Sequence, residues 1–103
     1  MSKFVFVYSG GSMAQTPEEQ QASMQEWMDW FGTLGESVAD IGNPFGASST
    51  VSADGSIAGP GKLGATGYTT ITADSLDSAT AAAKGCPVLA TGGSIDVYEA
   101  VQM

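Results

Sequence analysis

The sequence predicts an α+β fold, with strands and helices in the ferredoxin-like order β-α-β-β-α-β and an antiparallel sheet. Two observations predict this class. Stretches rich in β-branched and aromatic residues occur near the start, the middle and the end of the chain, and two stretches with helix-capping residues separate them. The 103 residues are 43% hydrophobic, so we expect residues 1–103 to form one domain with a substantial core.

Residues 3–8 predict the first strand, because apolar side chains fall on both of its faces and a glycine-rich loop follows. One face is aromatic and the other mostly aliphatic: Phe4, Phe6 and Tyr8 against Lys3, Val5 and Val7. We therefore expect both faces of this strand to be covered.

The segment TPEE predicts the start of the first helix, with Thr16 as N-cap, Pro17 in the first turn and Glu19 completing a capping box. Gly35 is expected to end it. Large apolar residues recur at helical spacing and predict the inner face: Met24, Trp27, Met28, Phe31 and Leu34. Trp30 lies on a neighbouring arc and is expected to be partly exposed or at an interface.

The middle of the chain predicts a short strand at 37–41, a turn at 42–46 and a hairpin at 47–59. Asp54 and Gly55 are expected to form a two-residue hairpin turn. The hairpin strands are weakly apolar, which favours an edge or a protruding ribbon. A glycine-rich loop at 59–67 and a β-branched strand at 68–73 follow.

Residues 74–87 predict the second helix, capped by Asp74 or Ser75 and stopped by Gly85 and Pro87. Its expected inner face is small: Leu76, Ala79, Ala82 and Ala83. Residues 94–102 alternate and predict the last strand. Two helices cover only one face of such a sheet, so we expect a second copy of the chain to cover the other, giving a homodimer.

The charge balance excludes several partners. Eleven acidic residues face three lysines, with no arginine or histidine and a net charge of −8. Nucleic acids and anionic membranes both require clustered cations, so neither is an expected partner. No apolar run approaches the length of a membrane span, and no signal peptide is recognisable, which predicts a cytoplasmic protein. The single cysteine suits a reducing compartment.

The Ser9–Ser12 loop after the first strand is not expected to bind phosphate. No Lys-Ser/Thr pair follows its glycines, and Glu18 and Glu19 occupy the first turn of the next helix. Neither Ser9 nor Ser12 has a histidine to activate it as a nucleophile. Cys86 is predicted to be a small, buried apolar residue. We expect no metal site and no cofactor.

Four stretches of the chain resemble the YCII-related family, of the branch called DGPF: KFVFVYSGG, TPEEQQASMQEWMDWFGTLGE, GNPFGASSTVSADG and GYTTITADSLDSATAAAKGCPVLATGGSIDVYE. The resemblance implies a dimeric α+β barrel but no single reaction. The motif that names the branch is replaced here by Ala58-Gly59-Pro60-Gly61. A His–Asp pair associated with another branch lacks its histidine, so we transfer no catalytic residue.

Three functions remain open. The first is a homodimer that binds a small apolar or aromatic molecule in a pocket at the sheet–helix junction. Its candidate ligand-binding residues are Tyr8, Ser9, Trp27, Asn43, Phe45 and Tyr98. The second is a cofactor-free isomerase, lyase or monooxygenase that uses Asp96 and Tyr68 as acid–base groups, although a water-facing Asp96 would be an ordinary solvated charge. The third is an acidic interaction or structural protein with a basic partner.

Overall fold

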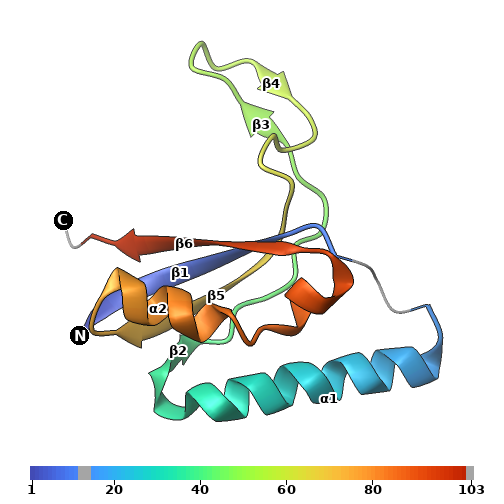
Figure 1. The fold of residues 1–103 in the computed structure, drawn as a ribbon. Coiled ribbons are helices and arrows are strands. Elements are labelled where there is room, and N and C mark those ends of the chain that lie inside the picture. The colour runs from blue at the N-terminus through green and yellow to red at the C-terminus, as the bar shows by residue number, and fades with distance from the viewer. Residues whose placement is uncertain (12–14, 102–103) are drawn as a thin grey trace.

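The structure is a computed structural model that describes residues 1–11 and 15–101. It is a mixed α+β fold with a four-stranded antiparallel sheet, two helices and a separate two-stranded hairpin (Figure 1). Ser12, and Gln102 at the end of the last predicted strand, lie outside the described residues. In chain order the elements are β1 Ser2–Ser9, α1 Pro17–Leu34, β2 Val38–Asp40, β3 Thr50–Val51, β4 Ile57–Ala58, β5 Ala65–Ala73, α2 Leu76–Ala83 and β6 Ser94–Ala100. Two short 3-10 turns, η1 Gly35–Ser37 and η2 Pro87–Thr91, complete them.

The sheet has the strand order β2-β5-β1-β6, with β1 paired to β5 on one side and to β6 on the other. The expected alternation of β1 is confirmed. Its aromatic face is buried, with Phe4, Phe6 and Tyr8 all below one tenth exposed, whereas Val5 and Val7 on the opposite face are only half-buried. The aromatic face packs against side chains of both helices, which forms the core.

The inner face of α1 differs from the one predicted by periodicity. Met24 and Met28 are exposed, at 65% and 63%, whereas Trp30 is buried at 5%. The indole of Trp30 packs against Phe6 with 6.1 Å between ring centroids, and its N–H donates to the carbonyl of Ala82 at 3.2 Å. A large aromatic ring with a partner for its N–H gains more from burial than a methionine does, so the helix turns Trp30 inward.

The helix caps are largely as predicted. The N–H of Glu19 donates to Oγ1 of Thr16 at 3.1 Å, and Gly35 ends α1 with φ +55°. The return bond of the capping box is displaced by one residue, because Oε2 of Glu19 accepts from the N–H of Gln15. In α2 the cap is Ser75, whose Oγ accepts from the N–H of Ser78. Ala79 and Ala83 are buried as expected, but Leu76 is half exposed.

The hairpin at 47–61, which we call the arm, projects away from the sheet (Figure 1). Its turn has three residues rather than two, since Ser52 donates to the carbonyl of Ser56 and encloses residues 53–55. Gly55 has φ +88°, as the last position of such a turn requires. Asp54 adds two bonds, accepting from the N–H and the hydroxyl of Ser56. The expected protruding ribbon is thus confirmed.

The arm also makes the chain extended. The radius of gyration of the chain is 15.0 Å, whereas a compact domain of this size has about 13 Å. The sheet face opposite the helices, which we call the open face, has no helix over it within the described residues. It carries Val5 and Val7 of β1, with Tyr68 and Thr70 of β5 and Asp96 and Tyr98 of β6 in register beside them.

Candidate functional site

A chain of hydrogen bonds runs through the core beneath the sheet–helix junction. The Tyr8 hydroxyl donates to Oγ1 of Thr69 at 2.6 Å, and that hydroxyl donates to the carbonyl of Ile41 at 2.8 Å. Thr69 is fully buried. These two hydrogen bonds therefore connect β1 to β5 and to the segment that follows β2. Burial raises the pKa of Tyr8 well above its ordinary value, and the hydrogen bond between Tyr8 and Thr69 offsets only part of this effect. Tyr8 is thus neutral and already paired.

Trp27 packs against the first residue of this series of hydrogen bonds. Its indole meets the ring of Tyr8 edge-on, with 5.1 Å between centroids and 80° between planes. It also contacts Trp30 edge-on at 5.8 Å and Phe31 at 5.9 Å. Unlike Trp30, Trp27 is only half-buried. Three aromatic neighbours fix its orientation while part of its surface remains accessible.

The accessible part of Trp27 lines a groove of about 340 Å³ between α1 and η2, which we call the junction groove. The groove is built from the glycine pair that follows β1, residues 19–27 of α1 and the turn η2 before β6. Its lining residues are Gly10, Gly11, Glu19, Ala22, Ser23, Glu26, Trp27, Pro87, Val88 and Thr91. One wall is therefore aromatic and aliphatic, and the carboxylates of Glu19 and Glu26 are the charged groups among these ten residues.

The glycine pair after β1 shapes one end of this groove. Gly10 and Gly11 have φ +70° and +85°, a region that favours glycine. A Cβ on Gly11 would lie 3.0 Å from Oγ1 of Thr91 and 3.3 Å from Cγ2 of Val88. The glycines thus allow the chain to approach η2 closely.

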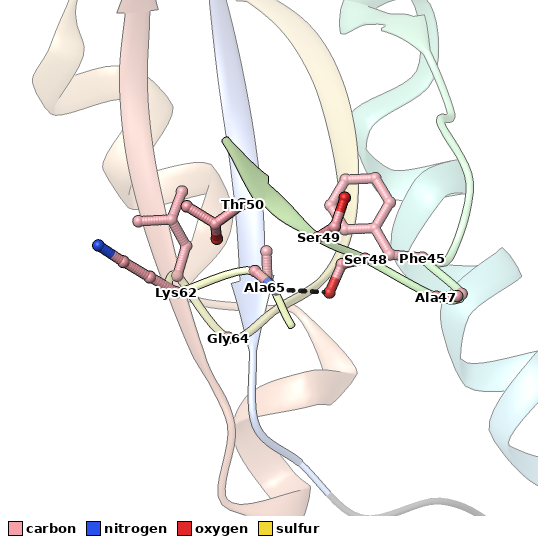
Figure 2. Close-up of a pocket in the computed structure, with 11 residues that line it drawn as sticks. Phe45, Ala47, Ser48, Ser49, Thr50, Lys62, Gly64 and Ala65 are labelled. Atoms are coloured by element: carbon pink, nitrogen blue, oxygen red, sulfur yellow. Dashed lines mark hydrogen bonds between the residues drawn. The ribbon is translucent and has the colours of Figure 1, made fainter. Parts of the chain in front are cut away.

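A second, larger pocket lies at the base of the arm, and we call it the arm-base pocket (Figure 2). It has a volume of about 640 Å³ and is lined by residues 45–50 and 61–65. Figure 2 shows Phe45 and Lys62 on opposite sides of it. Ser48 closes its base, since Oγ accepts from the N–H of Gly61 at 2.9 Å. Lys62 is the one charged residue among the eleven that line it.

A third group of candidate residues lies on the open face. The Tyr68 hydroxyl donates to Oδ2 of Asp40 at 3.3 Å, and its ring stacks on Phe45 with 5.7 Å between centroids. Tyr68 and Asp96 both lie opposite Val7, one on each neighbouring strand. Tyr98 lies on the same face and is 59% exposed. The two acid–base candidates are thus brought to the same face, separated by one strand.

The predicted ligand-binding residues are therefore divided between the two sides of the sheet. Tyr8 and Trp27 lie together on the helix side, and Phe45 and Tyr98 lie on the open side. Ser9 is half-buried at the end of β1. Asn43 is exposed, and its carbonyl accepts from the N–H of Tyr68. Tyr68 lies opposite Val7 in the β1–β5 register, and side chains alternate along β1, so Tyr8 and Tyr68 lie on opposite faces of the sheet.

Several residues of these sites were not singled out from the sequence. Glu26 and Val88 line the junction groove, and Lys62 lines the arm-base pocket. Asp40 pairs with Tyr68 across 28 positions of sequence, which no local pattern indicates. Thr69 could have been found from the sequence. It lies on the same strand face as the apolar Ile71, which is buried, and a buried hydroxyl requires hydrogen-bond partners.

Cys86 is buried, as expected, with 3% of its surface exposed. Burial raises the pKa of its thiol to about 11, so the thiolate is scarce at neutral pH. In the described part of the chain, no three His, Cys, Asp or Glu side chains gather closely enough to hold a metal ion. Among the same residues, no helix is both long enough and apolar enough to cross a membrane.

Comparison of the chain with protein-family models, curated proteins and solved structures finds no match.

Proposed function

We propose that the protein is a homodimeric binding module that holds a small molecule with an apolar or aromatic body in the junction groove. The observation that carries this proposal is the half-buried indole of Trp27, fixed by aromatic neighbours and accessible from a groove of about 340 Å³. Small-molecule sites are typically concave, largely apolar and preformed, with few polar groups.

The shape and rigidity of the groove support an aromatic ligand. Trp27 of α1 lines the groove, and Pro87 and Val88 of η2 add further apolar lining. Because Tyr8 and Trp30 pack edge-on against Trp27, the indole does not need to reorient when a ring stacks on it. A preformed wall lowers the entropic cost of binding.

The charges at the groove favour a neutral or cationic ligand over an anion. Glu19 and Glu26 line the groove, and the chain carries a net charge of −8. A carboxylate or phosphate ligand would meet both local and overall repulsion. An aromatic ammonium compound would gain from the carboxylates and from the indole face.

The homodimer is part of the same proposal. We take the fold as a ferredoxin-like unit whose open face meets that of a second copy, as in the dimeric α+β barrel that resemblance to the YCII-related family implies. The strand order β2-β5-β1-β6 supports this arrangement, as do the half-buried Val5 and Val7 and the exposed Tyr98 of the open face. A face of this kind gains from removal of its apolar surface from water.

Tryptophan fluorescence tests the binding proposal. Phenethylamine, indole and benzoate serve as cationic, neutral and anionic probes of similar size. We expect phenethylamine and indole, but not benzoate, to change the emission of the wild type. In Trp27→Phe the remaining emission comes from buried Trp30, which serves as an internal control and should not respond. A response that persists in Trp27→Phe, or preferred binding of benzoate, would contradict the proposal.

A second candidate function is cofactor-free acid–base catalysis on the open face. It is favoured by the position of Tyr68 and Asp96 on either side of Val7, with Asp40 bonded to the Tyr68 hydroxyl. If two open faces meet, these groups become enclosed between the copies, where acid–base chemistry is more effective. The test is a turnover assay of Asp96→Asn and Tyr68→Phe. Full activity in both variants would exclude these roles.

A further inference from the structure

We propose that the arm docks on a second copy of this chain through Val51 and Ile57. This inference rests on the proposed homodimer and adds a second contact region to it. The arm is the part of the chain that leaves the body of the fold (Figure 1), and its apolar side chains are the observation that carries the proposal.

Val51 and Ile57 form one apolar face of the arm. They lie directly opposite each other in the β3–β4 pair, so their side chains point to the same side of the hairpin. Val51 is 65% exposed and Ile57 is 76% exposed. The other cross-strand pair, Thr50 and Ala58, belongs to the opposite side, where Thr50 lines the arm-base pocket. The apolar face is thus directed away from the pocket.

The arm has little apolar packing within its own chain to stabilise it. A two-stranded hairpin is marginally stable on its own in water, and three strands or a packed apolar face are needed for independent stability. Each strand of this arm has only two residues, Thr50–Val51 and Ile57–Ala58. Side-chain bonds at its two ends, from Ser56 to Asp54 and from Gly61 to Ser48, define its shape but bury no apolar surface.

The low charge of the arm favours a second copy of this chain as the occupant over a charged partner. The chain has a net charge of −8, so two copies repel each other over most surfaces. Between residues 41 and 61 the sequence contains one charged residue, Asp54, which lies in the turn of the arm. The arm therefore approaches an acidic partner with little repulsion and offers almost nothing to a basic protein or a nucleic acid.

The same chain also supplies a surface for the arm to cover. Val5, Val7 and Tyr98 on the open face are apolar groups that the helices leave accessible. In a two-fold dimer each copy presents both an arm and an open face, so the contact forms twice and the interface is self-complementary. We infer that each arm extends over the margin of its partner's open face.

Sedimentation equilibrium of Ile57→Asp against the wild type tests the proposal, with Met24→Asp as matched control. Met24 is a similarly exposed apolar residue, but it lies on α1, on the helix side. We expect Ile57→Asp to raise the dimer Kd about tenfold or more and Met24→Asp to leave it unchanged. Far-UV circular dichroism confirms that both variants fold, and hydrogen exchange gives an independent reading. In the wild type, protection of the Ser52 and Gly55 amides should increase with protein concentration.

The outcomes separate the proposals. A dimer whose Kd is the same in Ile57→Asp, with arm amides that exchange independently of concentration, overturns arm docking and leaves the homodimer intact. A monomeric wild type overturns both, while the Trp27 titration still decides ligand binding. If the wild type instead co-sediments with phosphatidylcholine vesicles and Ile57→Asp does not, the arm docks on lipid and the proposal is wrong.

Discussion

Replacing Thr69 by valine should reveal how much of the stability depends on the hydrogen-bond chain under Trp27. Valine keeps the shape and β-propensity of threonine but cannot bond. The substitution leaves the Tyr8 hydroxyl without its acceptor and the Ile41 carbonyl without its donor. An unpaired buried polar group costs about 1–3 kcal/mol; the Tyr8 hydroxyl is such a group, whereas the carbonyl of exposed Ile41 can bond water, so we expect Thr69→Val to lower the free energy of unfolding by about 1–3 kcal/mol.

Tyr8→Phe is the partner substitution and should cost less. It removes the hydroxyl that donates, but Thr69 keeps its bond to Ile41, so no donor is stranded. The expected loss is about 0.5–1.5 kcal/mol. The double variant should lose less than the sum of the two, because without the tyrosine hydroxyl one of the stranded groups no longer exists.

Urea unfolding followed by tryptophan fluorescence measures all three variants against the wild type. Trp30 is buried and Trp27 contacts Tyr8, so emission reports the core directly. The reasoning would be refuted if Tyr8→Phe cost as much as Thr69→Val, or if the two losses added fully. Either result would mean that the Tyr8–Thr69 and Thr69–Ile41 hydrogen bonds do not depend on each other.

Two further predictions concern single positions. Gly42→Ala should destabilise the fold by more than about 2 kcal/mol, because Gly42 has φ +78° and an added Cβ would lie 1.8 Å from the Tyr68 carbonyl oxygen. Gly46→Ala is the control, since the described residues leave its Cβ free of contacts within 4 Å, and thermal melts of both check this. For Cys86, burial raises the folded-state pKa from 9.0 to about 11. The folded state therefore holds this proton more tightly, so its contribution to stability is complete below pH 9 and is lost as pH rises through 11. Urea unfolding between these pH values should show a smaller decline in Cys86→Ala, and an equal decline would contradict the assignment.

The sequence predicted the elements of the fold well where local chemistry determines them. Thr16 and Gly35 delimit α1, and alternation assigned the two faces of β1, because caps and strand periodicity act over a few residues. The predicted inner face of α1 was rotated by part of a turn from the observed one. Periodicity finds an apolar stripe, but the choice between Met24 and Trp30 depends on Phe6 and Ala82, which belong to distant elements.

The candidate site was harder to predict for the same reason. Tyr8 and Trp27 were both singled out, but their edge-on contact arises only when β1 and α1 pack together. Strand alternation also assigns Tyr8 and Tyr68 to opposite faces once their register is known, and that register is a long-range pairing. Composition therefore identified the aromatic residues, whereas the partition into a groove and an open face required the structure.

The distribution of charge connects these surfaces. Four of the eleven carboxylates lie on α1, on the helix side of the sheet, at Glu18, Glu19, Glu26 and Asp29, and two of these, Glu19 and Glu26, line the junction groove. The arm contributes one carboxylate over residues 47–61. Association through α1 would bring these four charges together, whereas association through the arm and the open face brings together, besides the carboxylate of the arm, only Asp40 and Asp96 and leaves the groove accessible. One charge pattern thus favours a dimer on one side of the sheet and a neutral or cationic ligand on the other.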